Sequence, residues 1–120
     1  MSPSTAVTTC LTKYADFSGR APRSEYWWFF LATVVVAAVL EAVPGNVGAT
    51  LSVVGGLVLL VPGLSAGARR LHDTGRSGWW QLIVLVPLLG LIVLVVWLAS
   101  EGEPVVNAYG SPLVETVSPR

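Results

Sequence analysis

The sequence predicts an all-α integral membrane protein with about three transmembrane helices and a short N-terminal helix at the membrane surface. Of its 120 residues, 53% are hydrophobic and only 12% are charged, whereas soluble domains carry about 25% charged residues. The apolar residues gather into three long runs, and tryptophans and basic residues stand near the ends of these runs. Both features are typical of chains that cross a lipid bilayer.

The first segment is polar and precedes any apolar run. Residues 1–9 are small and polar, so we expect them to form a mobile tail. From Cys10 to Phe17 the apolar residues recur near helical spacing, with Leu11 and Tyr14 between them. This pattern favours a short interfacial helix at the start of a membrane domain over residues 10–100, although a plain polar lead-in would give a similar pattern.

The first expected span covers about residues 26–43. Its roughly 18 residues, at 1.5 Å each, give about 27 Å, which is close to the hydrocarbon thickness of a bilayer. Pro44 and the two residues after it end the run, and Glu41 lies near enough to that end to reach the interface. About 25 mostly polar residues come first, so we interpret the run as an uncleaved anchor instead of a signal peptide.

The second expected span covers about residues 47–66 and contains several glycines. Ser52 with Gly56, and Gly63 with Gly67, form small-xxx-small pairs that favour close packing against another helix. Pro62 removes one backbone hydrogen bond, which we expect a neighbouring group to replace.

The third expected span, about residues 79–100, is the longest apolar run and contains only Pro87 and Gly90 as breakers. As one helix it would be long enough to cross the bilayer with some tilt. If the two breakers bend it instead, the segment becomes a re-entrant hairpin and the polar tail over residues 101–120 returns to the side from which the segment came.

Charge placement predicts the orientation of these spans. The basic residues near the spans precede the first span or lie between the second and third, which puts both groups on one side of a three-span protein. The positive-inside tendency makes that side cytoplasmic, with the N-terminus inside and the C-terminus outside. The expected interface anchors are Trp27, Trp28, Trp79 and Trp80 on the cytoplasmic side and Trp97 on the opposite side.

The connection between the second and third spans holds an unusual density of ionisable residues: Arg69, Arg70, His72, Asp73 and Arg76. They form either a turn that sets topology, a site for anionic lipid headgroups, or an active site. On a helix Arg69 and Asp73 share a face and can form an ion pair, whereas His72 and Asp73 point in different directions. The dipeptide is therefore not a ready-made acid–base dyad, and we predict no catalytic residues.

The entry to the first span holds Arg20, Arg23 and Glu25. The arginines are expected to extend toward lipid headgroups, and the carboxylate favours the positive N-terminal end of the helix. Alternatively, Glu25 forms an ion pair with an arginine of the later cluster, because both lie on the same side of the membrane.

Cofactor chemistry has little support in the sequence. Cys10 is the only cysteine and His72 the only histidine, which excludes an internal disulfide and a zinc or iron–sulfur centre built from one chain. We therefore expect no metal, no cofactor and no nucleic-acid partner.

Three strings together resemble the YhaH/YhaI-like small bacterial inner-membrane proteins, a family catalogued as a domain of unknown function. They are FSGRAPRSEYWWFF from Phe17, ARRLHDTGRSGWW from Ala68, and GEPVVNAYGSP from Gly102. The resemblance covers about residues 14–113 and implies a plasma-membrane protein with a few spans, without implying an activity. The positions that match its motifs are Arg20, Arg23, Glu25, Arg69, Arg70, His72, Asp73, Arg76 and Asn107.

The leading functional hypothesis is a binding or scaffold protein that uses a cytoplasmic-face arginine cluster to hold anionic lipid or a partner protein. The candidate binding residues are Arg20, Arg23, Glu25, Arg69, Arg70, His72, Asp73 and Arg76. A second hypothesis is an oligomeric component of a small transporter or channel, in which Pro62 and Pro87 mark broken helices. A third is a headgroup-modifying enzyme that uses His72 and Asp73.

Overall fold

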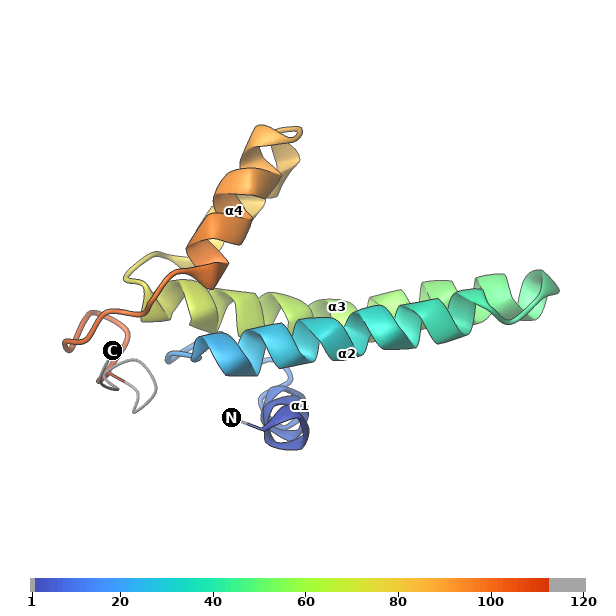
Figure 1. Ribbon diagram of the computed structural model, residues 1–120, viewed down its shortest axis with the longest axis horizontal. Helices are drawn as coiled ribbons and strands as arrows, with labels where there is room; N and C mark the ends of the chain where they lie inside the picture. The colour runs from blue at the N-terminus through green and yellow to red at the C-terminus, as the bar shows by residue number, and fades with distance from the viewer. Residues whose placement is uncertain (1, 113–120) are drawn as a thin grey trace.

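The computed structural model describes residues 2–112, and in these residues the regular structure is helical, which confirms the predicted all-α class. A short helix comes first, two long helices follow, and a 3-10 helix and a last α-helix complete the order (Figure 1). Their bounds are α1 Pro3–Thr12, α2 Arg23–Glu41, α3 Gly45–Asp73, η1 Gly78–Leu85 and α4 Leu89–Ala99.

Helices α2 and α3 form an antiparallel pair that sets the long axis of the molecule (Figure 1). A tight connection joins them, in which Gly45 adopts a left-handed φ of 74°. A side-chain carbon on Gly48 would lie 1.7 Å from the carbonyl oxygen of Val43, so the close approach at this turn requires glycine there. A methyl group on Gly55 would similarly meet Leu40 at 2.7 Å, which shows how closely α2 approaches the small residues of α3.

Both long helices expose apolar side chains around much of their circumference. They are long and apolar enough to cross a membrane, and only 11% of the most apolar window of each is buried within the protein. Val39 and Leu57, for example, are 60% and 64% exposed. Apolar surface on this scale is stable in lipid and costly in water.

Helix α3 continues well beyond its expected end near residue 66. At 1.5 Å per residue its 29 residues span roughly 44 Å, more than the roughly 30 Å hydrocarbon core of a bilayer. Arg69 and Arg70, which were expected in the connection beyond the second span, therefore lie on the last turns of this helix.

Pro62 sits inside α3 without ending it, so it does not mark a broken helix. A proline cannot donate to the carbonyl four residues earlier, which is that of Val58. The hydroxyl of Tyr14 donates a hydrogen bond to this carbonyl oxygen. The prediction that a neighbouring group replaces the missing backbone bond is confirmed.

The third apolar segment, expected as one helix over residues 79–100, is not one continuous helix. Helices η1 and α4 instead form a hairpin that stands out sideways from the α2–α3 pair (Figure 1). Pro87 interrupts the helical bonding, and Leu88 reverses the chain with a φ of 62°. The arms cross closely at Gly90, where a side-chain carbon would lie 1.6 Å from the carbonyl oxygen of Ile83.

Both ends of this hairpin lie beside the end of α3. Gln81 on η1 donates a 3.0 Å hydrogen bond to the carbonyl of Leu64, and Arg70 donates a 2.9 Å bond to the carbonyl of Leu98 on α4. Trp97 packs edge-on against Trp80 with ring centroids 5.5 Å apart. Trp97, expected at the opposite interface from Trp80, thus lies in contact with Trp80 within the hairpin.

The N-terminal segment also differs from expectation. Helix α1 begins at Pro3, inside the segment expected to be a mobile tail, and ends at Thr12, before the expected interfacial helix over residues 10–17 is complete. The Ser2 side chain accepts a 3.2 Å hydrogen bond from the backbone amide of Thr5 and so caps the helix. Cys10 is buried against Phe29 of α2 and Ala66 of α3, which fixes α1 on the helix pair.

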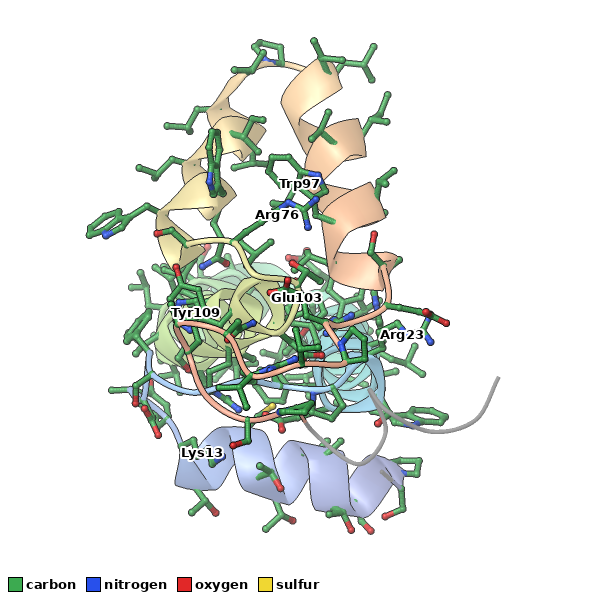
Figure 2. The ribbon with its side chains drawn as sticks, turned by 90° about the vertical axis from the view of Figure 1, so that its left-hand side faces the viewer. Lys13, Arg23, Arg76, Trp97, Glu103 and Tyr109 are labelled. Carbon is green, nitrogen blue, oxygen red and sulfur yellow. The ribbon has the colours of Figure 1, made fainter. Side chains whose placement is uncertain are left out.

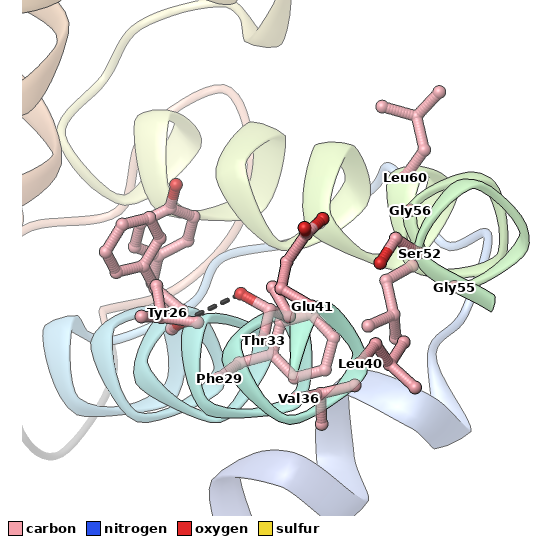
Figure 3. A pocket seen from close by; sticks show the side chains of 15 residues that line it. Tyr26, Phe29, Thr33, Val36, Leu40, Glu41, Ser52, Gly55, Gly56 and Leu60 are labelled. Carbon is pink, nitrogen blue, oxygen red and sulfur yellow. Dashed lines mark hydrogen bonds between the residues drawn. The ribbon is translucent and has the colours of Figure 1, made fainter. Parts of the chain in front are cut away.

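A pocket of about 350 Å³ lies between α2 and α3 (Figure 3). Aromatic and aliphatic side chains of α2 form one wall, and Gly55, Gly56 and Gly63 leave space along α3. The carboxylate of Glu41 and the hydroxyl of Ser52 are the polar groups near one end (Figure 3). Gly55 permits the close approach of Leu40, whereas a side-chain carbon on Gly56 or Gly63 would meet no atom within 4 Å.

Candidate functional site: a buried charge cluster

One end of the helix pair holds charged side chains that are almost completely buried. These residues are Arg20, Glu25, Arg69, Arg70, His72 and Asp73, each at most 8% exposed. Together we call them the charge cluster. They come from the segment before α2, the first turn of α2 and the last turns of α3, so the cluster exists only when these elements are assembled.

Glu25 on α2 and Arg69 on α3 form one of its ion pairs, with side chains 2% and 0% exposed. The predicted pairing of Glu25 with an arginine of the later cluster is confirmed. The Cys10 thiol lies 3.6 Å from the same carboxylate, which brings α1 into the arrangement. Three helices therefore meet at this one pair.

Asp73 accepts from two arginines at once. Its carboxylate lies 2.7 Å from Nε of Arg20 and 2.6 Å from Nη1 of Arg70. The ion pair of Asp73 with Arg70 is thus formed between residues three positions apart in α3, whereas Arg69, which can share a face with Asp73, pairs with Glu25. The difference follows from the position of Arg69, whose guanidinium is directed to Glu25 on α2.

Arg70 connects α3 to the hairpin. Besides Asp73 it donates to the carbonyl of Ala21 at 3.0 Å, to that of Leu98 at 2.9 Å, and to that of Ser100. Trp27 on α2 donates to the same Leu98 carbonyl at 3.2 Å. Because the last carbonyls of a helix have no partner within it, these donors satisfy the end of α4 and hold it in place.

Arg20 connects the segment before α2 to the tail. Its guanidinium donates to the carbonyls of Val105 at 3.0 Å and Gly110 at 3.2 Å, as well as to that of Glu103. The tail, expected on the opposite side of the membrane, therefore lies at the same end of the helix pair as Arg20. Figure 2 shows the tail, with Glu103 and Tyr109, between the hairpin and α1.

His72 is held on two sides by backbone and ring contacts. Its Nδ1 lies 2.9 Å from the carbonyl oxygen of Gly19, and its ring stacks on Tyr109 with centroids 3.9 Å apart. Asn107 donates a 3.0 Å bond to the His72 carbonyl. Asn107 and Tyr109 were missed as site residues, because only the resemblance to a family motif singled out Asn107 and nothing in the local pattern of the tail indicates packing.

The remaining basic residues near this end stay within reach of solvent or lipid headgroups. Lys13 and Arg23 are exposed, and Arg76 is half-buried with its guanidinium 4.6 Å from the ring centre of Trp97. Figure 2 shows the three on different parts of the chain: Lys13 follows α1, Arg23 begins α2, and Arg76 lies between α3 and η1. The expected anchors Trp28, Trp79 and Trp80 are 38%, 80% and 50% exposed, whereas Trp27 is half-buried.

Cys10 provides a direct chemical test of this packing. Burial, and secondarily the nearby Glu25 carboxylate, raises the pKa of its thiol from 9.0 to about 11. Between pH 7 and 8 the thiolate fraction is therefore about 100-fold below that of an unperturbed thiol, because each pKa unit is a factor of ten. We expect maleimide labelling of the single cysteine to be at least 100-fold slower in the folded protein than after denaturation; equal rates would contradict the packing of α1.

Two exposed apolar helices joined at one end by buried ion pairs define a small helical integral membrane protein. The chain belongs to the family described as "Protein of unknown function (DUF805)", which matches residues 14–111.

Two curated relatives from Escherichia coli strain K12 carry names that agree with this class. The chain is 42% identical to "Inner membrane protein YhaI" over 104 residues, which covers 84% of this chain and 88% of the relative. It is 35% identical to "Inner membrane protein YhaH" over 107 residues, covering 83% and 88%. No solved structure matches. The chain is thus a bacterial inner-membrane protein, as the resemblance implied.

Proposed function

We propose that this protein is a non-enzymatic binding or scaffold protein of the plasma membrane, in which basic residues around the charge cluster hold anionic lipid headgroups at the cytoplasmic face. The observation that carries the proposal is the division of the basic residues into two groups. Arg20, Arg69 and Arg70 are buried in ion pairs, whereas Lys13, Arg23 and Arg76 remain accessible at the same end.

This division changes the roles assigned from the sequence. Arg69 and Arg70 are 0% exposed, so a headgroup has no direct access to them in this structure. Their role in the proposal is to hold together the elements that carry the accessible cations. Lys13, Arg23 and Arg76 come from three different segments, and their arrangement depends on the charge cluster.

The proposed topology has two crossings and one re-entrant hairpin, with both ends of the described chain in the cytoplasm. The 8 residues of η1 at about 2.0 Å each and the 11 of α4 at about 1.5 Å each both give arms of roughly 16 Å. That length is about half of a hydrocarbon core of roughly 30 Å. Such a hairpin is long enough to enter one leaflet and return.

Lipid retention tests the proposed role. Basic residues near a membrane surface contribute about 1 kcal/mol each toward anionic lipid, so the triple variant Lys13→Gln, Arg23→Gln, Arg76→Gln should lose about 3 kcal/mol, or roughly 100-fold in preference. Native mass spectrometry of gently extracted protein measures the ratio of retained phosphatidylglycerol to phosphatidylethanolamine. We expect a large fall for the triple variant with an unchanged unfolding temperature.

Arg120→Gln is the charge-matched control for the single variant Arg23→Gln, since each removes one positive charge. If these two single variants lose anionic lipid equally, net charge explains the retention and the assigned site is wrong. A wild-type protein that retains no anionic lipid would also contradict the proposal.

A further inference from the structure

A second pocket, of about 320 Å³, lies where the end of α3 meets η1 and the segment before α2. We propose that it binds a neutral, membrane-soluble molecule through a hydroxyl group that donates a hydrogen bond to His72. The pocket is separate from the accessible cations of the proposed function and none of them lines it. Its lining residues include Phe17, Leu64, His72, Gly78, Gln81 and Leu82.

The imidazole of His72 has a fixed tautomer. Nδ1 lies 2.9 Å from the Gly19 carbonyl oxygen, which only accepts hydrogen bonds, so Nδ1 carries the proton. In the neutral ring Nε2 is then an acceptor. Stacking on Tyr109, with the rings 1° from parallel, fixes the ring plane. The acceptor is thus held in place before any ligand arrives.

The free nitrogen faces the pocket. Among the described residues no hydrogen-bond partner is assigned to Nε2, although His72 is only 8% exposed. A side-chain carbon on Gly78 would lie 3.6 Å from Nε2, so glycine at this position leaves the approach open. A ligand hydroxyl that enters the pocket can therefore donate a hydrogen bond to this nitrogen.

Gln81 and Ser77 are the other polar side chains that line the pocket, and the Ser77 hydroxyl oxygen already accepts a 3.3 Å hydrogen bond from the backbone amide of Trp79. The Gln81 amide nitrogen donates to the carbonyls of Leu64 at 3.0 Å and Gly78 at 3.3 Å, which leaves its Oε1 to accept. Two acceptors select a ligand that donates. A neutral hydroxyl suits the site better than an ammonium group, because three arginines and only two carboxylates are buried nearby among residues 2–112.

The apolar walls indicate the rest of the ligand. Phe17, Leu64, Trp79 and Leu82 line the pocket and are 47%, 40%, 80% and 56% exposed, so the pocket opens onto surface that suits lipid. Ligand sites are mostly apolar with a few placed polar groups, which is the composition here. A quinol headgroup and an acylglycerol headgroup both offer a hydroxyl joined to an apolar chain.

The single histidine permits a direct experiment. Selective ¹⁵N-histidine labelling gives NMR signals from the two ring nitrogens of His72 alone, measured in detergent at pH 8. The probes are a decyl-substituted benzoquinol, its dimethyl ether, and dioctanoylglycerol. We expect a saturable shift of the Nε2 signal with at least one hydroxyl probe, a much smaller change at Nδ1, and no Nε2 shift with the ether.

A shift with the benzoquinol would indicate a quinol ligand, and a shift with dioctanoylglycerol would indicate an acylglycerol. Either result supports the site. Absence of an Nε2 shift with both hydroxyl probes overturns the proposal, as does an equal shift with the dimethyl ether, which would show partitioning without a hydrogen bond.

Two exposed leucines of α3 provide matched variants. Leu64→Trp fills the pocket and should abolish the shift, whereas Leu57→Trp, at a position 64% exposed and outside the pocket, should leave it intact. Equal shifts in the two variants would place the ligand elsewhere and contradict the assignment. A preserved Nδ1 signal in each variant shows that the histidine environment is intact.

Discussion

Replacing Asp73 by asparagine is expected to lower the free energy of unfolding by about 3–5 kcal/mol, the range for removing one partner of a buried ion pair. Asp73 is the carboxylate that lies against both Arg20 and Arg70, at 2.7 and 2.6 Å. Asparagine keeps the shape of the side chain but leaves two buried guanidinium groups without a compensating charge. The tail and the hairpin, which these two arginines hold, should loosen together.

Thermal and denaturant unfolding of the detergent-solubilised protein measure this loss, and limited proteolysis reports release of the tail. Asp16→Asn is the matched control, because Asp16 is exposed and its carboxylate accepts hydrogen bonds from Ser18 within its own turn. The control should cost less than about 1 kcal/mol. Equal losses for the two variants would show that the charge cluster does not stabilise the fold.

Glu25→Gln is expected to have a similarly large effect, about 3–5 kcal/mol, because it leaves Arg69 buried without its only carboxylate partner among the described residues. Nε and Nη2 of Arg69 have no hydrogen-bond partner within the described residues, so the Glu25 carboxylate is the main compensation for this buried charge. Its loss should therefore cost more than one hydrogen bond. Accessible Arg23, replaced by glutamine, should change stability by less than about 1 kcal/mol.

The double variant Glu25→Met, Arg69→Leu distinguishes pairing from packing. Apolar replacement of a whole buried ion pair is often neutral or stabilising, so the double variant should be more stable than Glu25→Gln alone. The pairing would be contradicted if the double variant lost as much free energy of unfolding as the single variants Glu25→Met and Arg69→Leu lose in sum.

The membrane class and the two long helices could be predicted from the sequence, and the pairing of Glu25 with some arginine of the later cluster was foreseen as an alternative. Apolar runs of this length leave few alternatives to a lipid environment, since an apolar helix must be buried in protein or in lipid. The pairing of Glu25 with an arginine had a different basis. Glu25 precedes the first span and the arginines follow the second, so an antiparallel pair of spans brings them to the same end.

The hairpin could not be predicted in the same way. A continuous helix and a re-entrant hairpin bury the same apolar residues in lipid, so composition does not separate them. Pro87 and Gly90 indicated the bend, but Pro62 is a similar breaker inside α3 and does not end that helix. The two prolines differ in what happens to the backbone hydrogen bond that each removes. In α3 the Tyr14 hydroxyl donates to the Val58 carbonyl in place of Pro62, whereas after Pro87 the chain reverses at Leu88.

The contacts of the tail were also beyond local sequence patterns. Arg20 binds backbone carbonyls more than 80 positions later, at Val105 and Gly110. Every residue has a backbone carbonyl, so the residue types in the tail do not show which carbonyls accept hydrogen bonds from Arg20. Helix α1 was missed because its buried contacts are few and small, namely Ala6 and Cys10 in an otherwise polar segment.

The central claim is that the charge cluster holds the tail and both ends of the hairpin at the membrane side that carries Arg20. Its most direct test is the side on which single cysteines react with a membrane-impermeant maleimide, in intact spheroplasts and in inverted vesicles. In a Cys10→Ser background, cysteines replace Ser18 before α2, Asn46 at the far turn, and Ser111 in the tail, all exposed positions. The account predicts that positions 18 and 111 react only in inverted vesicles and position 46 only in spheroplasts. If position 111 instead reacts only in spheroplasts, as position 46 does, the third segment crosses the membrane. The contacts of Arg20 and Arg70 with the tail and hairpin then cannot form, and the account is wrong.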